Sequence, residues 1–290
     1  MRRCLQLAAN GLGRVRPNPL VGCVVVKDGR IISEGFHQEY GHNHAERNAL
    51  LRPLSTFNFQ LSTLYVNLEP CSHHGKTPPC ADLIIEKGIK RVVCCNDDPN
   101  PLVAGNGFRK LEEAGIEVVR HVLEEEGREL NRRFFTFIEQ RRPYVILKWA
   151  ESADGFIDRH RQSRANGPAV RFSTPWTQMQ VHRLRATHEA ILVGRRTWEL
   201  DQPSLTTRYW PGRSPERIVL SASGAPLADS IGRFQSLLVE GGAQTLQSFI
   251  DADLWDEAFI ERSPMLLGSG VKAPQIQTDP KGRPVHVNFT

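Results

Sequence analysis

Three residues in the first third of the chain have the types and the order of a catalytic zinc site. They are His44, in a His-Ala-Glu triplet, then Cys71 and Cys80. One imidazole and two thiolates suit Zn²⁺, and three protein ligands leave the fourth position open for water. Water bound to zinc ionises near neutral pH, and a carboxylate beside the metal, here Glu46, can pass its proton to a leaving amine. The pattern predicts a hydrolytic zinc centre.

Each part of this pattern also has a structural interpretation. Asn43 could cap a helix, with Glu46 as its capping-box partner. On an ideal helix His44 and Glu46 point about 200° apart, so spacing alone does not bring both to one metal. Cys71 and Cys80 could be buried thiols. The presence of all these elements in this order favours metal binding over the structural interpretations. A purely structural zinc site usually has a fourth Cys or His ligand, so the three-ligand pattern favours a catalytic site. The H-x-E…P-C…C order is that of zinc-dependent nucleobase deaminases.

The segment between the two cysteines is longer than the two residues of a short CxxC motif. It has eight residues, SHHGKTPP, at positions 72–79. Two histidines, a lysine, a glycine and two prolines could form a cationic loop that holds a phosphate beside the metal. A solvated loop with incidental charges is the alternative.

The elements that must position these residues alternate between helices and strands. A first amphipathic helix is expected at residues 5–12, and a hairpin at 20–32 with its turn at residues 27–30. Further helices are expected at about 44–51, from 80 and at 105–114, and strands from 63, from 91 and at 116–119. A charged helical stretch at 124–142 ends at Pro143. The alternation predicts an α/β sheet with helices on its faces, and Pro143 is the expected domain boundary.

A second α/β unit is expected after Pro143. Strands are predicted at 144–150 and 190–194, with a further strand that ends at 220 and one that begins at 236. Helices are predicted at 174–186 and in a stretch that ends at 250. The Gly241-Gly242 pair between a strand and a helix could let backbone amides approach a cofactor phosphate, although an ordinary turn has the same form. Arg185 and Arg208 could bind a substrate phosphate, or could be surface arginines.

Length and composition restrict the class of protein. At about 150 residues per domain, 290 residues indicate two domains, and 40% hydrophobic with 24% charged residues exclude disordered and collagen-like chains. The longest apolar run, residues 20–26, is too short to span a membrane. All six cysteines lie within the first 95 residues, which favours metal binding or catalysis in a cytoplasmic protein over a disulfide scaffold.

The charge distribution argues against nucleic acid as a partner. The net charge is +5, and residues 1–142 carry 20 Lys and Arg against 17 Asp and Glu, while residues 143–290 carry 17 against 15. No basic arm emerges from these numbers. A polynucleotide deaminase would be expected to have a basic face and a short CxxC, and the sequence has neither.

The first half resembles a known family of enzymes. Residues 1–142 are similar to the deaminase half of the bifunctional riboflavin-biosynthesis deaminase/reductases in the segments PNPLVG (17–22), HAE (44–46), LEPCSHHGKTPPC (68–80) and DPNP (98–101). The resemblance implies a cytidine-deaminase-like three-layer domain in which zinc is held by His44, Cys71 and Cys80 and Glu46 is the proton shuttle. It implies that substrate contacts come from Asn18 at the pyrimidine and from His37, His73, Lys76 and Asn100 at the ribose phosphate. The implied reaction is hydrolytic deamination of 2,5-diamino-6-(ribosylamino)pyrimidinone 5′-phosphate.

Residues 144–270 resemble the reductase half of the same family, which has a dihydrofolate-reductase-like α/β fold, so a reductase domain is expected at 143–290. The similar segments are KWAESADG (148–155), LRA (184–186), AILVG (190–194), RRT (195–197), DQPSLTTR (201–208), VEGGA (239–243) and PMLLG (264–268). The resemblance implies reduction of the ribosyl group to a ribityl chain by NADPH. It implies substrate contacts from Arg185, Leu205, Arg208 and Glu240, and NADPH contacts from Thr197, Asp201, Gly242 and Thr245.

One segment departs from the family pattern. A strand–helix–strand stretch of roughly 40 residues is expected between the RIVL and VEGG strands, but only residues 221–235 connect them here. Either the reductase half is shortened or the sequence omits a segment, and missing central strands would leave exposed sheet edges and an incomplete adenine-side pocket. Two functions remain open: a bifunctional enzyme, or a deaminase whose second half is a structural or dimerisation module. A homo-oligomer, with dimerisation through the second half, is expected.

Overall fold

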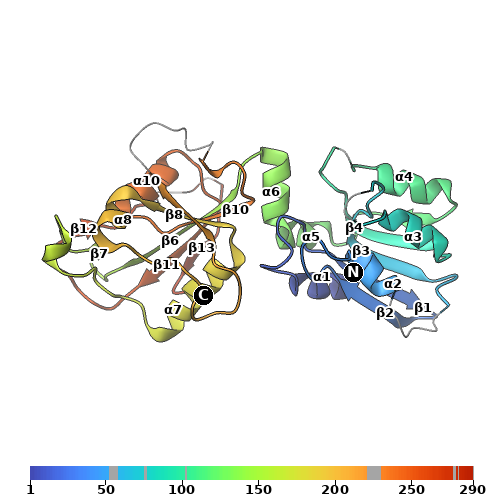
Figure 1. Cartoon of the computed structure of the whole chain (residues 1–290), viewed down its shortest axis with the longest axis horizontal. Helices are drawn as coiled ribbons and strands as arrows, with labels where there is room; N and C mark the ends of the chain where they lie inside the picture. Colours follow the sequence, from blue (N-terminus) through green and yellow to red (C-terminus); the bar gives the residue numbers. More distant parts are fainter. Residues whose placement is uncertain are drawn as a thin grey trace. The chain divides into compact units, whose positions relative to one another are not determined.

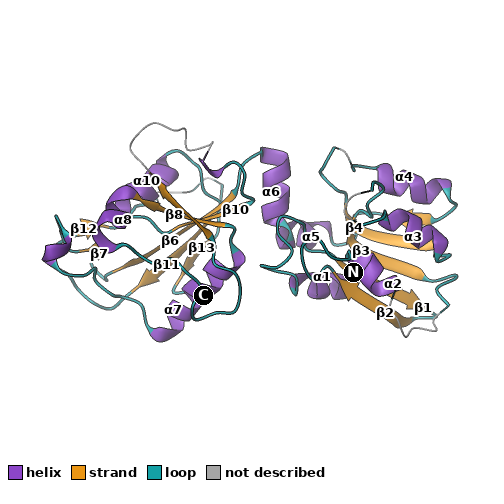
Figure 2. Ribbon diagram, viewed as in Figure 1, coloured by secondary structure: helices purple, strands orange, loops and turns teal. Residues whose placement is uncertain are grey.

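The chain folds into two compact units, residues 1–140 and 141–290, in a computed structural model (Figure 1). The structure describes residues 1–51, 58–74, 77–101, 103–220, 230–276, 279 and 281–289. Each unit is a β-sheet with helices on both faces (Figure 2). Within these described ranges, every helix is too short or too polar to cross a membrane.

The first unit contains a five-stranded sheet with the strand order β2-β1-β3-β4-β5. Its strands are β1 (Gly22–Lys27), β2 (Arg30–Phe36), β3 (Thr63–Leu68), β4 (Arg91–Asn96) and β5 (Glu117–Val119). Strand β1 is antiparallel to β2 and β3, whereas β3, β4 and β5 run parallel. The predicted hairpin is confirmed: Asp28 and Gly29 form its two-residue turn, both with positive φ, as the tight turn between twisted strands requires.

Helices cover both faces of this sheet, which confirms the expected three-layer fold. They are α1 (Arg2–Ala9), α2 (Ala45–Leu50), α3 (Cys80–Glu86), α4 (Asn106–Glu113), α5 (Glu124–Leu130) and α6 (Arg132–Gln140). Successive side chains of a strand point to opposite faces. Accordingly, Cys23 and Val25 of β1 belong to the core under α2, α3 and α4, whereas Val24 packs with Cys4 and Leu7 of α1.

The continuous helix expected at 124–142 is two helices, α5 and α6, divided at Asn131. This side chain is buried, and its amide accepts a hydrogen bond from Leu20 N at 2.8 Å and donates one to Leu20 O at 2.9 Å. Asn67 of β3 adds a bond to Leu20 O at 2.9 Å and one from Gly22 N at 2.7 Å. The two asparagines therefore fix the segment 17–22, which carries Asn18.

The second unit contains a six-stranded sheet with the order β13-β11-β6-β10-β8-β9, in which all neighbours are parallel. Its strands are β6 (Tyr144–Glu151), β8 (Ala190–Gly194), β9 (Glu216–Leu220), β10 (Ser236–Val239), β11 (Glu257–Arg262) and β13 (Val285–Val287). A separate antiparallel pair is formed by β7 (Phe156–Asp158) and β12 (Val271–Lys272). The helices are α7 (Pro175–Thr187), α8 (Arg195–Asp201) and α10 (Ala243–Asp251), with a 3₁₀ turn at Arg164–Asn166.

Both faces of this sheet are buried, as expected for parallel strands. Leu147 and Leu237 pack with Phe249 of α10 on one face, and Ile146 and Leu238 lie in the core on the other. Helix α7 begins where predicted, because Thr174 accepts a hydrogen bond from Thr177 N.

The strand order bears on the short connection, at which missing central strands would leave exposed sheet edges. The centre of the sheet, β6-β10-β8, is continuous, and β9, which precedes the connection, lies at the edge of the described sheet. Residues 221–229 themselves lie outside the described residues.

Candidate functional site

The three predicted zinc ligands come together in the first unit. Cys71 follows β3, Cys80 is the first residue of α3, and His44 immediately precedes α2. The Nδ1 atom of His44 lies 3.5 Å from the Sγ of Cys71 and 3.6 Å from the Sγ of Cys80. All three ligand atoms lie within 4.8 Å of one another.

These separations fit a tetrahedral zinc site. With Zn–S near 2.3 Å and Zn–N near 2.0 Å, two tetrahedral ligands lie about 3.5 Å apart, which is the His44–Cys71 and His44–Cys80 spacing. Hydrogen bonds from Cys80 and His44 lower the pKa of Cys71 to about 4. The hydrogen bond to Cys71 and burial raise the pKa of the Cys80 thiol. The donor set offers one imidazole and two sulfurs, the ligands that zinc prefers.

Glu46 lies beside these ligands, although the helical spacing argued against it. His44 has extended backbone angles and stands before the helix, so the ideal-helix rotation does not apply to it. Glu46 is 3% exposed in the first turn of α2 and lies close enough to His44, Cys71 and Cys80 for their charges and dipoles to act on its carboxyl group. Burial raises the pKa of Glu46 to about 7. No side chain caps this helix, so the capping-box interpretation with Asn43 is wrong.

Asn18 and His37 form a hydrogen-bonded pair near the same ligands. The Nδ2 atom of Asn18 lies 3.0 Å from Nε2 of His37, and Nδ1 of His37 lies 3.0 Å from the carbonyl of Asn43. Burial lowers the pKa of His37, so the ring is neutral, donates to Asn43 and accepts from Asn18. The His37 and His44 rings meet edge to face at 5.5 Å. His37 therefore orients Asn18 through the hydrogen bond between them. Because His37 is only 2% exposed, it has little surface of its own for a ligand.

The other predicted contacts of the first unit lie on two loops. His73 is exposed on the segment after Cys71, and Lys76 lies outside the described residues. Asn100 is half-buried, and its backbone N–H donates to Oδ1 of Asp98 at 2.9 Å. Burial raises the pKa of Asp98 to about 6.

Glu69 connects these two loops, and sequence reasoning gave it no role. Its buried carboxylate accepts hydrogen bonds from the backbone N–H groups of Asp98, Gly105 and Gly107 at 3.3, 3.0 and 2.9 Å. Gly107 lies so close that an added Cβ would come within 2.0 Å of the carbonyl oxygen of Pro70. An acidic residue directly before the Pro-Cys pair is the signal that could have indicated this anchor.

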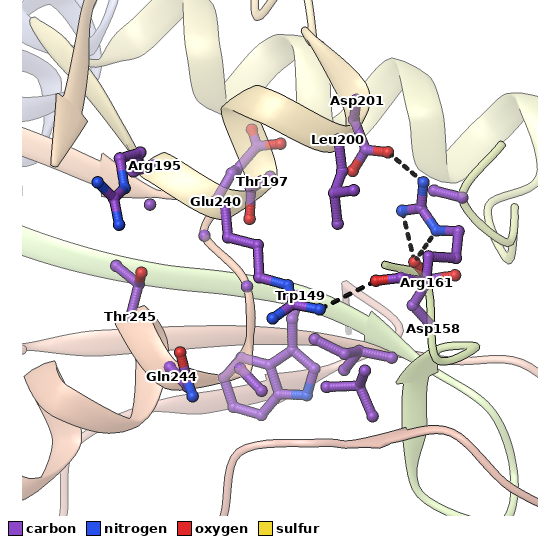
Figure 3. Close-up of a pocket in the computed structure, with 18 of the residues that line it drawn as sticks. Trp149, Asp158, Arg161, Arg195, Thr197, Leu200, Asp201, Glu240, Gln244 and Thr245 are labelled. Atoms are coloured by element: carbon purple, nitrogen blue, oxygen red, sulfur yellow. Dashed lines mark hydrogen bonds and ion pairs between the residues drawn. The ribbon is translucent and has the colours of Figure 1, made fainter. Parts of the chain in front are cut away.

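In the second unit, a cavity of about 880 Å³ opens at the carboxyl ends of β6, β8 and β10 (Figure 3). Ligands of open parallel sheets bind at this edge. All four residues predicted to contact NADPH line it: Thr197, Asp201, Gly242 and Thr245.

Two glycines allow the close packing around this cavity. A Cβ on Gly194 would come within 2.3 Å of the Thr245 hydroxyl, and one on Gly241 would come within 2.8 Å of the Thr245 Cβ. The VGRRT and VEGGA segments therefore need glycine because α10 approaches the strand ends closely.

The carboxylate of Asp201 forms an ion pair within the wall of the cavity. It pairs with Arg161 at 2.8 Å, and Arg161 also donates to Asp158 at 2.8 Å, as Figure 3 shows. Arg161 is buried. Sequence reasoning missed Arg161 and Asp158, because nothing in the chain order links position 161 to position 201.

A smaller cavity of about 420 Å³ lies next to the first and is rich in basic side chains. Arg185 and Arg208, both predicted, line it together with three residues that were not: Lys148, Arg171 and His182. Lys148 lines both cavities. The side chain of Leu205 lies instead in the hydrophobic core beneath the sheet.

Arg185 and Glu240 form a two-point ion pair at the junction of the cavities. The Nε and Nη2 atoms of Arg185 donate to the two carboxylate oxygens of Glu240 at 2.9 and 2.7 Å. Burial alone would raise the pKa of Glu240, but the charge and hydrogen bonds of Arg185 bring it below its ordinary value. Both groups are therefore ionised.

Two family models match the chain. The first is the cytidine and deoxycytidylate deaminase zinc-binding region, over residues 1–96. The second is the RibD C-terminal domain, the NADPH-dependent reductase part of these proteins, over residues 143–231 and 227–289. The second match is broken at residues 227–231, within the short connection between β9 and β10.

Relatives and solved structures agree with these matches. The riboflavin biosynthesis protein RibD of Actinobacillus pleuropneumoniae is 47% identical over 76% of this chain and 56% of its own length. That of Aquifex aeolicus is 37% identical over 93% of this chain and 88% of its own length. The latter alignment has 319 positions, more than the 290 residues here, so that relative has segments that this chain lacks.

The solved deaminase/reductase of Thermotoga maritima superposes with a TM-score of 0.84 at 38% identity, over 98% of this chain and 91% of that one. RibD of Acinetobacter baumannii superposes with a TM-score of 0.83 at 31% identity, over 94% and 88%. The chain therefore belongs to the RibD family of riboflavin-biosynthesis proteins, which join a zinc-binding deaminase domain to an NADPH-dependent reductase domain.

Proposed function

We propose that this chain catalyses two successive steps of riboflavin biosynthesis. The first is hydrolytic deamination of 2,5-diamino-6-(ribosylamino)pyrimidinone 5′-phosphate in residues 1–142. The second is NADPH-dependent reduction of the ribosyl group to a ribityl chain in residues 143–290. The observation that carries the first step is the His44, Cys71 and Cys80 cluster with the spacing of tetrahedral zinc ligands.

For deamination, the chain supplies a proton carrier and a base-binding face. A zinc ion held by the three ligands would supply the Lewis acid that makes water nucleophilic near neutral pH. Glu46, buried against Cys80, can take up a proton and return it to the leaving amine. Asn18, oriented by His37, keeps its amide oxygen available for the pyrimidine. Lys76, His73 and Asn100 are proposed at the ribose phosphate.

For reduction, two neighbouring cavities suit two ligands. The larger one, with Thr197, Gly242 and Thr245 on its wall, is proposed to hold NADPH, which supplies the hydride. Asp201 supports that wall through Arg161. The smaller, basic cavity is proposed to hold the substrate phosphate on Arg185 and Arg208, with Glu240 keeping Arg185 in place. The cavities share Lys148, so ligands bound in both would meet beside this residue.

A coupled assay tests both steps. Purified protein is given the diamino substrate, and ammonia release and NADPH oxidation are followed separately. Both signals are expected, with oxidation depending on prior deamination. Ammonia release from the diamino substrate, with no NADPH oxidation even when the deaminated compound is supplied directly, would instead support a deaminase whose second half has a structural or dimerisation role.

The compartment and the assembly belong to the same proposal. All six cysteines are free thiols, which suits a reducing, cytoplasmic environment. We also propose a homo-oligomer that dimerises through the second unit. Sedimentation of the full chain checks this, because a monomer at micromolar concentration would contradict it.

A further inference from the structure

His182 of α7 occupies a position that the proposed roles do not use. Its ring is 4% exposed and lines the smaller cavity. Its Nδ1 atom accepts a hydrogen bond from the backbone N–H of Arg208 at 2.7 Å and lies 3.4 Å from that of Tyr209. The Tyr209 ring packs against the imidazole edge to face, with centroids 4.7 Å apart.

This contact determines the protonation state of the ring. Backbone N–H groups can only donate, so Nδ1 must act as an acceptor and carry no proton. In the neutral ring the proton then lies on Nε2. A protonated imidazolium has a donor at both nitrogens and cannot accept from Arg208.

The segment that carries Arg208 is held by side chains from other parts of the chain, including Ser214, whose Oγ accepts from Thr207 N at 3.0 Å. The Arg208 side chain is exposed and donates to the hydroxyls of Ser204 and, at 3.0 Å, Thr206. Arg185 donates to the Thr206 carbonyl at 3.3 Å, two residues earlier. His182 is the side chain that holds the backbone of Arg208 itself.

We propose that His182 is a positioning residue for the phosphate of the reductase substrate: its neutral imidazole fixes the Arg208 backbone, and protonation of the ring releases it. The inference rests on the proposed role of Arg208 in phosphate binding. A merely structural core histidine would hold the fold without affecting phosphate affinity or its pH dependence, so the two readings differ in a measurable way.

The surrounding charges favour the neutral ring at pH 7. Burial lowers the pKa of His182, and the positive charges of Arg185 and Arg208 lower it further, against the opposing effect of Glu240. Lys148 and Arg171 are the other cationic residues that line this cavity. As the pH falls through this lowered pKa, the ring gains a proton, the Arg208 contact is lost, and affinity for phosphate should fall.

Two variants of the full-length protein separate the role of His182 as a hydrogen-bond acceptor from that of its side-chain volume. In His182→Asn the amide oxygen can still accept from the Arg208 N–H but does not titrate. In His182→Leu the volume is kept and the acceptor is lost. Binding of ribose 5-phosphate is measured by calorimetry between pH 5.5 and 8, alongside steady-state reduction and ammonia release. His121→Asn, a half-exposed histidine in the first unit, is the control.

At pH 7.5 we expect His182→Leu to weaken ribose 5-phosphate binding and raise the substrate KM about 3- to 10-fold, the effect of one lost hydrogen bond. The KM for NADPH and ammonia release should be unchanged. His182→Asn should bind like the wild type at pH 7.5 and lose less affinity on acidification. The ligand phosphate also titrates near pH 6, but equally in all variants, so their ratio isolates the histidine.

Some results would overturn the inference. These are wild-type affinity in a folded His182→Leu, or a His182→Asn variant whose affinity falls with acid as steeply as the wild type. If His182→Leu does not fold, as seen in its tryptophan fluorescence, the pH profile of His182→Asn decides alone. Failure of the proposed reductase function is distinguishable, because it would abolish NADPH oxidation in the wild type while ribose 5-phosphate binding still reports on His182.

Discussion

Removing one partner of the Arg185–Glu240 ion pair should destabilise the second unit strongly. The two side chains are only 12% and 10% exposed and share two hydrogen bonds, at 2.9 and 2.7 Å. In Glu240→Ala the guanidinium of Arg185 keeps its buried position and loses both carboxylate oxygens, while its contact with the Thr206 carbonyl at 3.3 Å remains. Breaking a buried ion pair in this way costs about 3–5 kcal/mol of unfolding free energy.

The distribution of tryptophan provides an assay for this unit alone. All five tryptophans lie between residues 149 and 255, within the second unit, so tryptophan fluorescence during urea unfolding follows that unit. With a typical m value of about 2 kcal/mol/M, the loss should lower the urea midpoint by about 1.5–2.5 M. The control is Glu199→Ala, which removes an exposed pair with Arg195 at 3.7 Å and should cost less than about 0.5 kcal/mol.

A double variant tests the reason for the effect. Arg185→Leu with Glu240→Leu leaves no unpaired buried charge, so it should recover a large part of the stability lost in Glu240→Ala. If Glu240→Ala costs no more than Glu199→Ala, the pair is not held as a buried ion pair. If the double variant loses as much unfolding free energy as the single variants Arg185→Leu and Glu240→Leu lose together, charge compensation is not the cause of the destabilisation.

The remaining predictions concern the two proposed activities. Cys71→Ser should lose most of the bound zinc in metal analysis, whereas Cys94→Ser, a buried thiol outside the cluster, should keep it; full zinc in both would disprove the ligand set. Glu46→Gln should retain zinc while ammonia release falls by at least about 10²-fold, and near-normal release would make Glu46 structural. Arg208→Ala should weaken reduction about 10- to 150-fold through the phosphate without changing ammonia release, and a loss of deamination would show that the halves are coupled.

The zinc cluster could be predicted because metal chemistry restricts which side chains may appear together. An imidazole and two thiols in the order of His44, Cys71 and Cys80 have few other uses, so residue types and order were sufficient. The position of Glu46 could not be derived from helical spacing. His44 precedes α2 with extended angles, and this one backbone conformation places both side chains at the same point.

Residues that act through the backbone of distant segments could not be predicted. Glu69 accepts from three N–H groups about 30 to 40 positions later, and His182 accepts from one 26 positions later. A single buried Glu or His has no periodic neighbour that would indicate such a partner. Asn131 is a related case, because its charged surroundings predict helix, yet its amide is used to hold Leu20.

Hydrophobic patterning predicted the strands and helices but not which side chains face a ligand. Leu205 lies between residues that do line or border the cavities, yet its own side chain belongs to the core. Its backbone has a positive φ of 53°, which turns the chain at this position. Proximity along the sequence to a binding segment is therefore weak evidence for contact, because a single turn redirects the side chain.

The short connection after β9 should affect the binding of NADPH more than that of the substrate. Leu220, the last described residue before it, lines the larger cavity, whereas all residues lining the smaller cavity come from other segments. The strand order keeps β6, β10 and β8 together, and the carboxyl end of β6, with Lys148 and Ala150, lines both cavities. The relative from Aquifex aeolicus has segments that this chain lacks. We therefore expect a higher KM for NADPH in this protein than in that relative when both are assayed side by side. The KM for the deaminated substrate should be similar in the two proteins. The opposite pattern, an unchanged KM for NADPH with a raised substrate KM, would mean that the shortened segment reaches the phosphate end of the site and that the two cavities are not independent.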